Sequence, residues 1–252
     1  MSKIPKIYHW IWLNFKDESQ LDTPIPVKYR KTIDETKRLN PDWEFIEWNG
    51  RMIRELMETR YPWFMPTFNS YKKPIQRADA SRYFILYTYG GIYTDLDSIC
   101  KKPLTPLLDK YADKDCIITK ENLGMGRPPN PTNSIILSKP GSDFMMYIIG
   151  ILPYAKAKYE DMPGMKSVFY TTGPQHIIHC LDSYAGRDSI GFLIEEVVNT
   201  TQTSKTLENF EYFINMNEGT WKEDYFVHKN QKLLITILIL CLIFIAYYKL
   251  KK

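Results

Sequence analysis

Short apolar runs alternate along the chain with longer segments in which apolar residues recur every three or four positions. The first pattern is typical of buried strands, and the second is typical of helices packed on a core. Strands that alternate with helices indicate an α/β layer architecture, in which ligands bind at the carboxyl ends of the strands. The pattern predicts strands at 4–13, 43–48, 92–99, 116–119 and 134–138, and helices at 27–39, 51–59, 75–89, 144–159 and 174–184.

One segment departs from this alternation, because residues 233–248 carry no charge at all. A helix of this length spans roughly 24 Å, against about 30 Å for the hydrocarbon core of a bilayer. Lysines flank the segment on both sides and can extend toward the headgroups. We predict a transmembrane anchor at 233–248, the alternative being a buried core helix. A folded domain (1–225), a linker (226–232) and a basic tail (249–252) would make up the rest.

Composition narrows the functional classes. The net charge of the 252 residues is only +4 and no concentrated basic stripe is present, which argues against a nucleic-acid partner. The four cysteines have no short spacing, so neither a disulfide framework nor a zinc site is expected. The first apolar run lacks the features of a signal peptide. We therefore expect a single-pass membrane protein, anchored near its C-terminus, with its folded domain in the cytosol; an endomembrane location is compatible with this.

The densest chemical signal lies in the predicted strand 92–99. Alternation along a strand places Tyr93, Asp95 and Asp97 on one face. Two neighbouring carboxylates repel each other unless a cation lies between them, and hard oxygen ligands favour Mg²⁺ or Mn²⁺. A second Asp-x-Asp, Asp113 and Asp115, falls in a polar stretch, where we interpret it as solvated surface.

A charged pair lies in the predicted helix 75–89, which directly precedes this strand. Asp79 and Arg82 are three residues apart and therefore share one helical face. Such a pair on a surface contributes little. Beside an acidic strand, however, the carboxylate can accept sugar hydroxyls and the guanidinium can hold hydroxyl or phosphate oxygens. The histidines, by contrast, are interpreted as structural: His9 in a buried strand, and His176 and His179 in the core or at the surface.

In combination, the motifs of this chain resemble the DXD-containing glycosyltransferases of family 32, which have the GT-A (Rossmann-like) fold. Three motifs look most like the catalytic subunit of mannosyl-inositol-phosphoceramide synthase, a branch that uses GDP-mannose and a sphingolipid acceptor; they lie at 61–64, 74–77 and 169–174. The large clostridial glucosylating toxins share the residue order more loosely. The matching segments occur in order at 4–12, 40–43, 61–64, 74–84, 89–97, 102–104, 170–174 and 219–221.

The resemblance implies roles on the donor side of the site. Trp12 would stack on the nucleotide base, and Tyr93 would pack beside the nucleotide. Asp79 and Arg82 would hold the donor sugar.

The resemblance also implies a metal site. Asp95 would contact ribose and metal-bound water, and Asp97 would ligate the metal. Thr220 and Trp221 would cap the diphosphate. Some family members have histidines just before that last pair, and here Asn217 is the candidate for the third ligand.

The predicted activity is therefore a metal-dependent, retaining transfer of a hexose, with Asp79, Arg82 and Asp97 as catalytic residues. GDP-mannose is favoured over UDP-sugars as donor, Mn²⁺ or Mg²⁺ as metal, and a lipid or glycan at the membrane as acceptor. One alternative is a UDP-sugar transferase that acts on a protein. The other is an inactive, membrane-tethered module that binds sugar nucleotides.

Overall fold

The computed structural model describes residues 2–14, 17, 19–121, 128–194, 197–199 and 212–216. Within these ranges, no helix is long and apolar enough to cross a membrane. The segments 226–232, 233–248 and 249–252 lie outside the described residues. The same holds for three predicted site residues, Asn217, Thr220 and Trp221.

Six strands form a mixed sheet in the order β2-β1-β3-β6-β5-β7. β1 pairs in parallel with both β2 and β3, whereas β6 is antiparallel to its neighbours β3 and β5. β7 is parallel to β5. The predicted α/β architecture is confirmed. The strands are β1 (Ile7–Ile11), β2 (Glu44–Trp48), β3 (Gly91–Thr94), β5 (Cys116–Glu121), β6 (Asn130–Ser138) and β7 (Ile190–Leu193).

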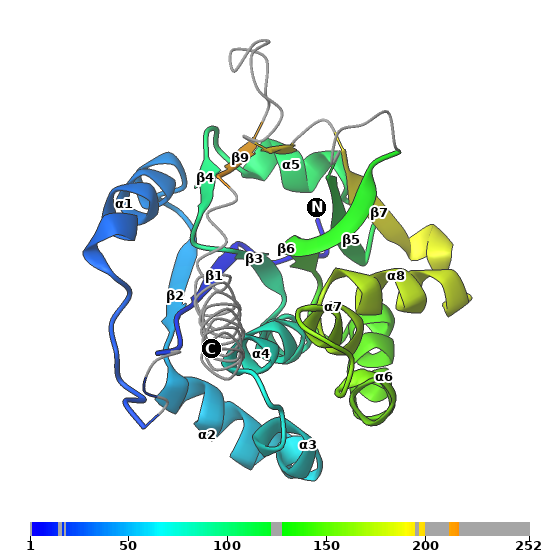
Figure 1. The fold of residues 1–252 in the computed structure, drawn as a ribbon. Helices are drawn as coiled ribbons and strands as arrows, with labels where there is room; N and C mark the ends of the chain where they lie inside the picture. The colour runs from blue at the N-terminus through cyan, green and yellow to red at the C-terminus, as the bar shows by residue number, and fades with distance from the viewer. Residues whose placement is uncertain are drawn as a thin grey trace, which may run out of the picture. The chain divides into compact units, whose positions relative to one another are not determined.

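Helices cover both faces of this sheet, α1 and α5 on one face and α2, α4 and α6 on the other (Figure 1). Each face has its own apolar cluster, with Ile33 and Leu107 in one and Ile53, Tyr83 and Ile148 in the other. The helices are α1 (Arg30–Leu39), α2 (Gly50–Arg60), α3 (Met65–Asn69), α4 (Pro74–Tyr89), α5 (Thr105–Lys110), α6 (Asp143–Tyr159), α7 (Lys166–Thr171) and α8 (Pro174–Ser183), with 3-10 turns η1 (Val27–Tyr29), η2 (Pro62–Phe64) and η3 (Arg187–Ser189).

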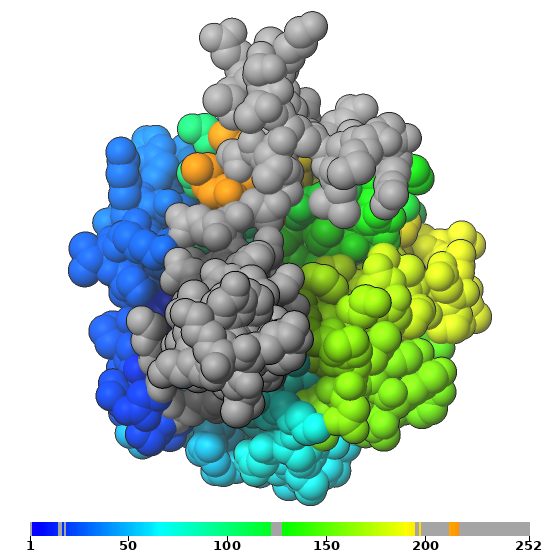
Figure 2. Space-filling model, in the orientation of Figure 1, coloured from blue at the N-terminus to red at the C-terminus, as the bar shows by residue number. Residues whose placement is uncertain are grey.

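The segments α6, α7 and α8 lie along one flank of the face drawn in Figure 2, and the N-terminal segments lie along the other. Close contacts between α6 and α7, and between α7 and α8, join the three helices. Their position matters because the loop between α7 and α8 carries Thr172, which reaches the charged centre described below.

The predicted strand 92–99 is not continuous, and this expectation was wrong. β3 ends at Thr94, the chain turns through 95–97, and β4 (Ser98–Cys100) then joins a second sheet with β9 (Phe213–Asn215) and β8 (Val197–Asn199). The Ser98 amide donates to the Asp95 carbonyl at 3.0 Å, which closes the turn. Asp95 and Asp97 therefore belong to a turn at the end of the strand.

Helix α4 has a sequence-encoded start and end. Pro74 occupies its first turn, where a missing amide proton costs nothing, and the Gln76 side chain accepts the Lys73 amide at 2.9 Å. The helix ends at Gly90, which has a positive φ of 67° and donates its amide to the Leu86 carbonyl.

A buried histidine joins three parts of the fold, as expected of a structural residue. The indole of Trp48 donates to His9 Nδ1 at 3.1 Å, so the ring proton lies on Nε2, which donates to the Gly90 carbonyl at 2.8 Å. Burial lowers the pKa of His9 to about 4, so the ring is neutral. The histidine thus links β1 to β2 and to the end of α4.

At Gly91, the start of β3 lies close against the backbone of β1. Its φ is +94°, and an added Cβ would lie 2.3 Å from the Ile7 carbonyl oxygen. We expect Gly91→Ala to lower the free energy of unfolding by more than about 2 kcal/mol, because backbone strain and a backbone clash add. Urea unfolding of the purified chain measures this change.

Gly150→Ala is the matched control. Gly150 is helical, and apart from the backbone of its own helix no described residue places an atom within 4 Å of an added Cβ. This substitution should stabilise the chain by up to about 1 kcal/mol through helix propensity. An equal effect of the two substitutions would contradict the proposed close approach at Gly91.

Candidate active site

The candidate site lies at one edge of the six-stranded sheet. β1, β2 and β3 are parallel, so their carboxyl ends meet there. β5 runs in the same direction as β3 because both are antiparallel to β6, and β6 begins at this edge. Trp12, Asp95 and Glu121 follow or close these strands, and Asn133 lies in the first half of β6. The edge is therefore rich in polar groups, as ligand sites in α/β sheets are.

A buried guanidinium lies at the centre of the site. Arg82 is only 3% exposed, and its Nη2 donates to Asp79 Oδ1 at 2.6 Å. Its Nη1 lies 3.2 Å from Asp95 Oδ1 and also donates to the Asn133 carbonyl. The guanidinium carbon stands 4.5 Å from the centre of the Tyr93 ring. Burial opposes its charge, but Tyr93 and the two carboxylates raise the pKa of Arg82 above its usual value.

One donor of this guanidinium has no protein partner. Nε of Arg82 is buried and makes no hydrogen bond among the described residues. Buried donors are normally satisfied, and an exception calls for an explanation, such as a ligand, ion or water that supplies the acceptor. The arrangement suits a ligand that carries anionic oxygens.

Asp79 is held by donors from three segments. Arg82 and the Asn133 amide group (3.0 Å) both donate to Oδ1, and the Thr172 hydroxyl donates to Oδ2 at 3.2 Å. Burial raises the pKa of Asp79 to about 6, although Arg82 and these hydrogen bonds lower it. The Asp79–Arg82 pair is thus buried, unlike an ordinary surface ion pair.

Asp95 and Asp97 are fixed from both sides of the turn that carries them. The Asp95 amide donates to the Ser134 carbonyl at 2.8 Å, and the Met216 amide donates to the Asp97 carbonyl at 2.9 Å. The Tyr93 hydroxyl donates to Asp95 Oδ1 at 2.8 Å. Partial burial of the carboxyl group raises the pKa of Asp95, and the nearby negative charge of Asp97 adds to this rise.

This donor set fits a hard divalent cation. When ionised, Asp79 and Asp95 carry two negative charges against the single positive charge of Arg82, and Asp97, in the same turn as Asp95, adds a third. A divalent cation would balance the remaining negative charge and favour the ionised carboxylates. Asp95 keeps 36% of its side chain exposed, and its described hydrogen bond and ion pair both engage Oδ1. Carboxylate oxygens are the preferred ligands of Mg²⁺ and Mn²⁺.

The described residues hold only part of a ligand set. They contain no group of three or more histidine, cysteine, aspartate or glutamate residues arranged to bind a metal. Asn217, the predicted third ligand, lies outside the described ranges, as do Thr220 and Trp221. The metal-binding and capping roles of these residues stay predictions.

Trp12 follows β1 directly and lies at the same edge as Asp95. Its amide donates to the Trp48 carbonyl at 2.9 Å. Its ring centre lies 6.1 Å from that of Tyr29, and the ring packs against the cluster on the α1 side of the sheet. Arg82 packs on Tyr93, which belongs to the opposite cluster. Stacking of Trp12 on a base stays a prediction.

The sequence did not identify Asn133 and Glu121 as site residues, and it pointed to 172–174 only as a stretch that shapes the acceptor side. Asn133 directly precedes the predicted strand 134–138, and nothing in the neighbouring sequence indicates its hydrogen bond to Asp79. Thr172 lies within a recognised motif, yet its contact with Asp79 depends on how α7 packs on α4. Glu121 is 5% exposed and closes β5. Only the tertiary structure brings the three residues to one edge.

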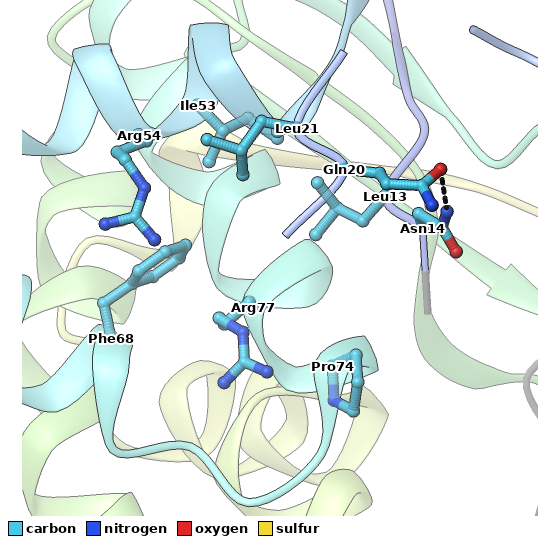
Figure 3. Close-up of a pocket in the computed structure, with 10 residues that line it drawn as sticks. Leu13, Asn14, Gln20, Leu21, Ile53, Arg54, Phe68, Pro74 and Arg77 are labelled. Carbon is cyan, nitrogen blue, oxygen red and sulfur yellow. Dashed lines mark hydrogen bonds between the residues drawn. The ribbon is translucent and has the colours of Figure 1, made fainter. Parts of the chain in front are cut away.

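A basic pocket of about 50 Å³ adjoins the first turns of α2 and α4. Figure 3 shows Arg54 from α2 and Arg77 from α4 on either side of Phe68. Asn14 and Gln20 lie at its other end, joined by a 3.3 Å hydrogen bond. No acidic side chain is among the described residues that line it.

Residues 26–121 match the family described as "Glycosyltransferase sugar-binding region containing DXD motif". Inositol phosphoceramide mannosyltransferase 1 of Schizosaccharomyces pombe is 48% identical over 113 residues, which are 44% of this chain and 33% of that protein. Mannosyl phosphorylinositol ceramide synthase SUR1 of Saccharomyces cerevisiae is 36% identical over 171 residues, 68% of this chain and 40% of that protein. The chain thus spans less than half the length of these relatives.

Among solved structures, mouse xyloside xylosyltransferase 1 superimposes with a TM-score of 0.49 at 12% identity, covering 86% of this chain and 99% of that chain. The family relationship rests on the sequence matches, which confirm the resemblance inferred from the motifs.

The raised pKa of Asp79 has a measurable consequence for stability. Because the folded chain holds this proton up to a pH of about 6, against an ordinary carboxyl value of 3.8, wild-type stability falls as pH rises through that window. Relative to Asp79→Asn, the wild type should lose about 2 kcal/mol between pH 4 and pH 6, out of about 3 kcal/mol over the whole titration. Denaturant unfolding of both chains across this range measures the difference.

Asp113→Asn is the control for this measurement. Lys114 lowers the pKa of the exposed Asp113, so its contribution to stability rises with pH instead of falling. A wild-type curve parallel to that of Asp79→Asn from pH 4 to pH 6 would contradict the raised pKa.

Proposed function

Because the chain belongs to the glycosyltransferases that contain a DXD motif, we propose that it transfers a hexose, mannose favoured, from a nucleoside-diphosphate sugar to an acceptor at a membrane. The acceptor is inositol phosphoceramide, which the names of its relatives favour, or a glycan. The proposed subclass of its α/β fold is GT-A. One observation carries the proposal: buried Arg82 contacts both the helix carboxylate Asp79 and the turn carboxylate Asp95.

GDP-mannose is the favoured donor, and Mn²⁺ or Mg²⁺ the favoured metal. Asp95 and Asp97 would hold the cation, with Asn217 as a further candidate. When bound, the cation would supply positive charge beside the departing diphosphate.

The chain's own residues organise the donor around Arg82. Its buried Nε, which makes no hydrogen bond to the described residues, would donate to anionic oxygens of the leaving group, whose charge grows as the anomeric bond breaks. Asp79 accepts sugar hydroxyls with the oxygen capacity that its three protein donors leave over. The ring of Tyr93 packs against the Arg82 guanidinium. The same side chain would pack beside the nucleotide.

We propose that the anomeric configuration is retained through attack on the front face of the sugar. The anomeric carbon–oxygen bond breaks, the acceptor oxygen bonds to the same face, and the leaving diphosphate takes the acceptor's proton. This route needs no further nucleophile from the protein. A covalent intermediate on a carboxylate is the alternative.

Two other functions make different predictions. A UDP-sugar transferase that modifies a protein would be stabilised by UDP-sugars more than by GDP-mannose in a thermal-shift series with Mn²⁺. An inactive binding module would be stabilised by a donor but would release no nucleotide from it.

The metal assignment predicts a specific loss of activity. With GDP-mannose and Mn²⁺ we expect slow hydrolysis of the donor by the wild type, measured as released GDP. The rate should fall at least about 100-fold in Asp97→Asn, because the substitution removes the negative charge of a carboxylate that binds the metal.

Asp113→Asn is the matched control, since it changes the other Asp-x-Asp at a side chain that is 73% exposed. It should hydrolyse the donor like the wild type. Hydrolysis that is unaffected by Asp97→Asn would count against the metal site, and an absence of GDP release in the wild type would favour the binding module.

We also propose that the apolar segment 233–248 anchors the chain to a membrane and leaves the folded domain in the cytosol, at an endomembrane or another bilayer. Its uncharged run and flanking lysines support this. Tethering would raise the local concentration of a membrane acceptor.

Removal of residues 233–252 tests the anchor. We expect the shortened chain to leave the membrane fraction in a flotation assay and to keep its rate of donor hydrolysis. Transfer to acceptor in vesicles should fall, since the advantage of tethering is lost. A shortened chain that still floats with membranes would refute the anchor.

A further inference from the structure

A buried carboxylate outside the proposed donor contacts collects three hydrogen bonds on one oxygen. Glu121 Oε1 accepts the Ser134 hydroxyl at 2.6 Å, the Asn215 amide group at 2.9 Å and the Thr132 hydroxyl at 3.2 Å. The residue is 5% exposed. Its donors come from β6 and β9, which are strands of two different sheets. Glu121 therefore joins the two sheets at the candidate site.

The same two strands hold the acidic turn. On one side, the Ser134 carbonyl accepts the Asp95 amide, and Ser134 is also a side-chain donor to Glu121. On the other side, Met216 donates its amide to the Asp97 carbonyl, and its neighbour Asn215 is a second donor to Glu121. The two ends of the turn are thus fixed by residues that share one carboxylate.

We propose that Glu121 is a positioning residue that sets the separation of Asp95 and Asp97 and thereby the affinity for the divalent cation; this rests on the proposed function. A charge-assisted hydrogen bond is about twice as strong as a neutral one, so the carboxylate holds its donors firmly. Groups that orient metal ligands without touching the metal typically contribute 10- to 100-fold in affinity. Glu121 contributes in this way through Ser134 and Asn215.

Glu160 provides the comparison for a purely structural carboxylate. It is 8% exposed and accepts the Lys72 amide and the Gln76 amide group, each at 2.7 Å. These bonds join the start of α4 to the end of α6, whereas the acidic turn is held by Ser134 of β6 and by Met216, which follows β9. Loss of Glu160 should reduce stability without changing the geometry of Asp95 and Asp97.

The test is Mn²⁺ binding, measured by calorimetric titration of the full chain in the presence of GDP. Glu121→Ala should raise the dissociation constant of Mn²⁺ about 10- to 100-fold. Glu121→Gln keeps an oxygen acceptor for Ser134 and Asn215, so its affinity should fall by less than about tenfold. Glu160→Ala should lower the melting temperature and leave the Mn²⁺ affinity within twofold of the wild type.

If Glu121→Ala does not fold, Ser134→Ala, Glu121→Gln and the double variant answer the same question. Because both substitutions act on one hydrogen bond, the double variant should lose less affinity than the product of the two single losses. If the double variant loses affinity by the product of the two single losses, Glu121 and Ser134 act independently and the proposed link between them is wrong.

The outcomes separate this inference from the proposed function. Wild-type affinity in Glu121→Ala, together with a lower melting temperature, would make Glu121 merely structural while the metal site stands. Wild-type affinity in Asp97→Asn, or no Mn²⁺ binding in the wild type, would instead remove the metal site itself.

Discussion

The burial of one positive charge organises this protein. Taking a guanidinium out of water is costly unless hydrogen bonds and opposite charges replace the solvent. Arg82 finds these in Asp79 from its own helix, Asp95 from the turn after β3, and the Asn133 carbonyl from β6. Tyr93 adds the face of its ring. The charge is therefore compatible only with a fold that brings helix α4, strand β3 and strand β6 to one place.

The sheet supplies that convergence through the close approach of β3 and β1. Gly91 allows β3 to pair with β1 where a side chain would clash, and Gly90 ends α4 so that the chain can enter β3 at once. His9 then binds the Gly90 carbonyl from β1. The short connection keeps Asp79 and Arg82, on the helix, next to Asp95, at the far end of the strand. A longer loop between α4 and β3 would not fix the distance between Arg82 and Asp95.

The part of the site that the family match covers is incomplete on its own. The match ends at Glu121, so it includes α4 and the acidic turn. Asn133, Ser134, Thr172 and Asn215, which hold the carboxylates or their neighbours, all come later in the chain. The matched segment thus carries the charged groups, whereas the later segments fix their positions. This division explains why the polar network is visible only after the chain has folded.

The sequence by itself determined the α/β alternation, the limits of α4 and the pairing of Asp79 with Arg82, because these depend on periodicity, helix caps and spacing along one helix. It also identified Asp95 and Asp97 through their motif. It placed them wrongly on one continuous strand, since local alternation cannot show where a strand leaves its sheet. Only the tertiary structure decided that these residues lie in a turn, that Arg82 is buried, that Asn133 and Thr172 donate to Asp79, and that Glu121 lies at the same edge of the sheet. Those facts depend on contacts between segments far apart in the chain, and no local pattern encodes them.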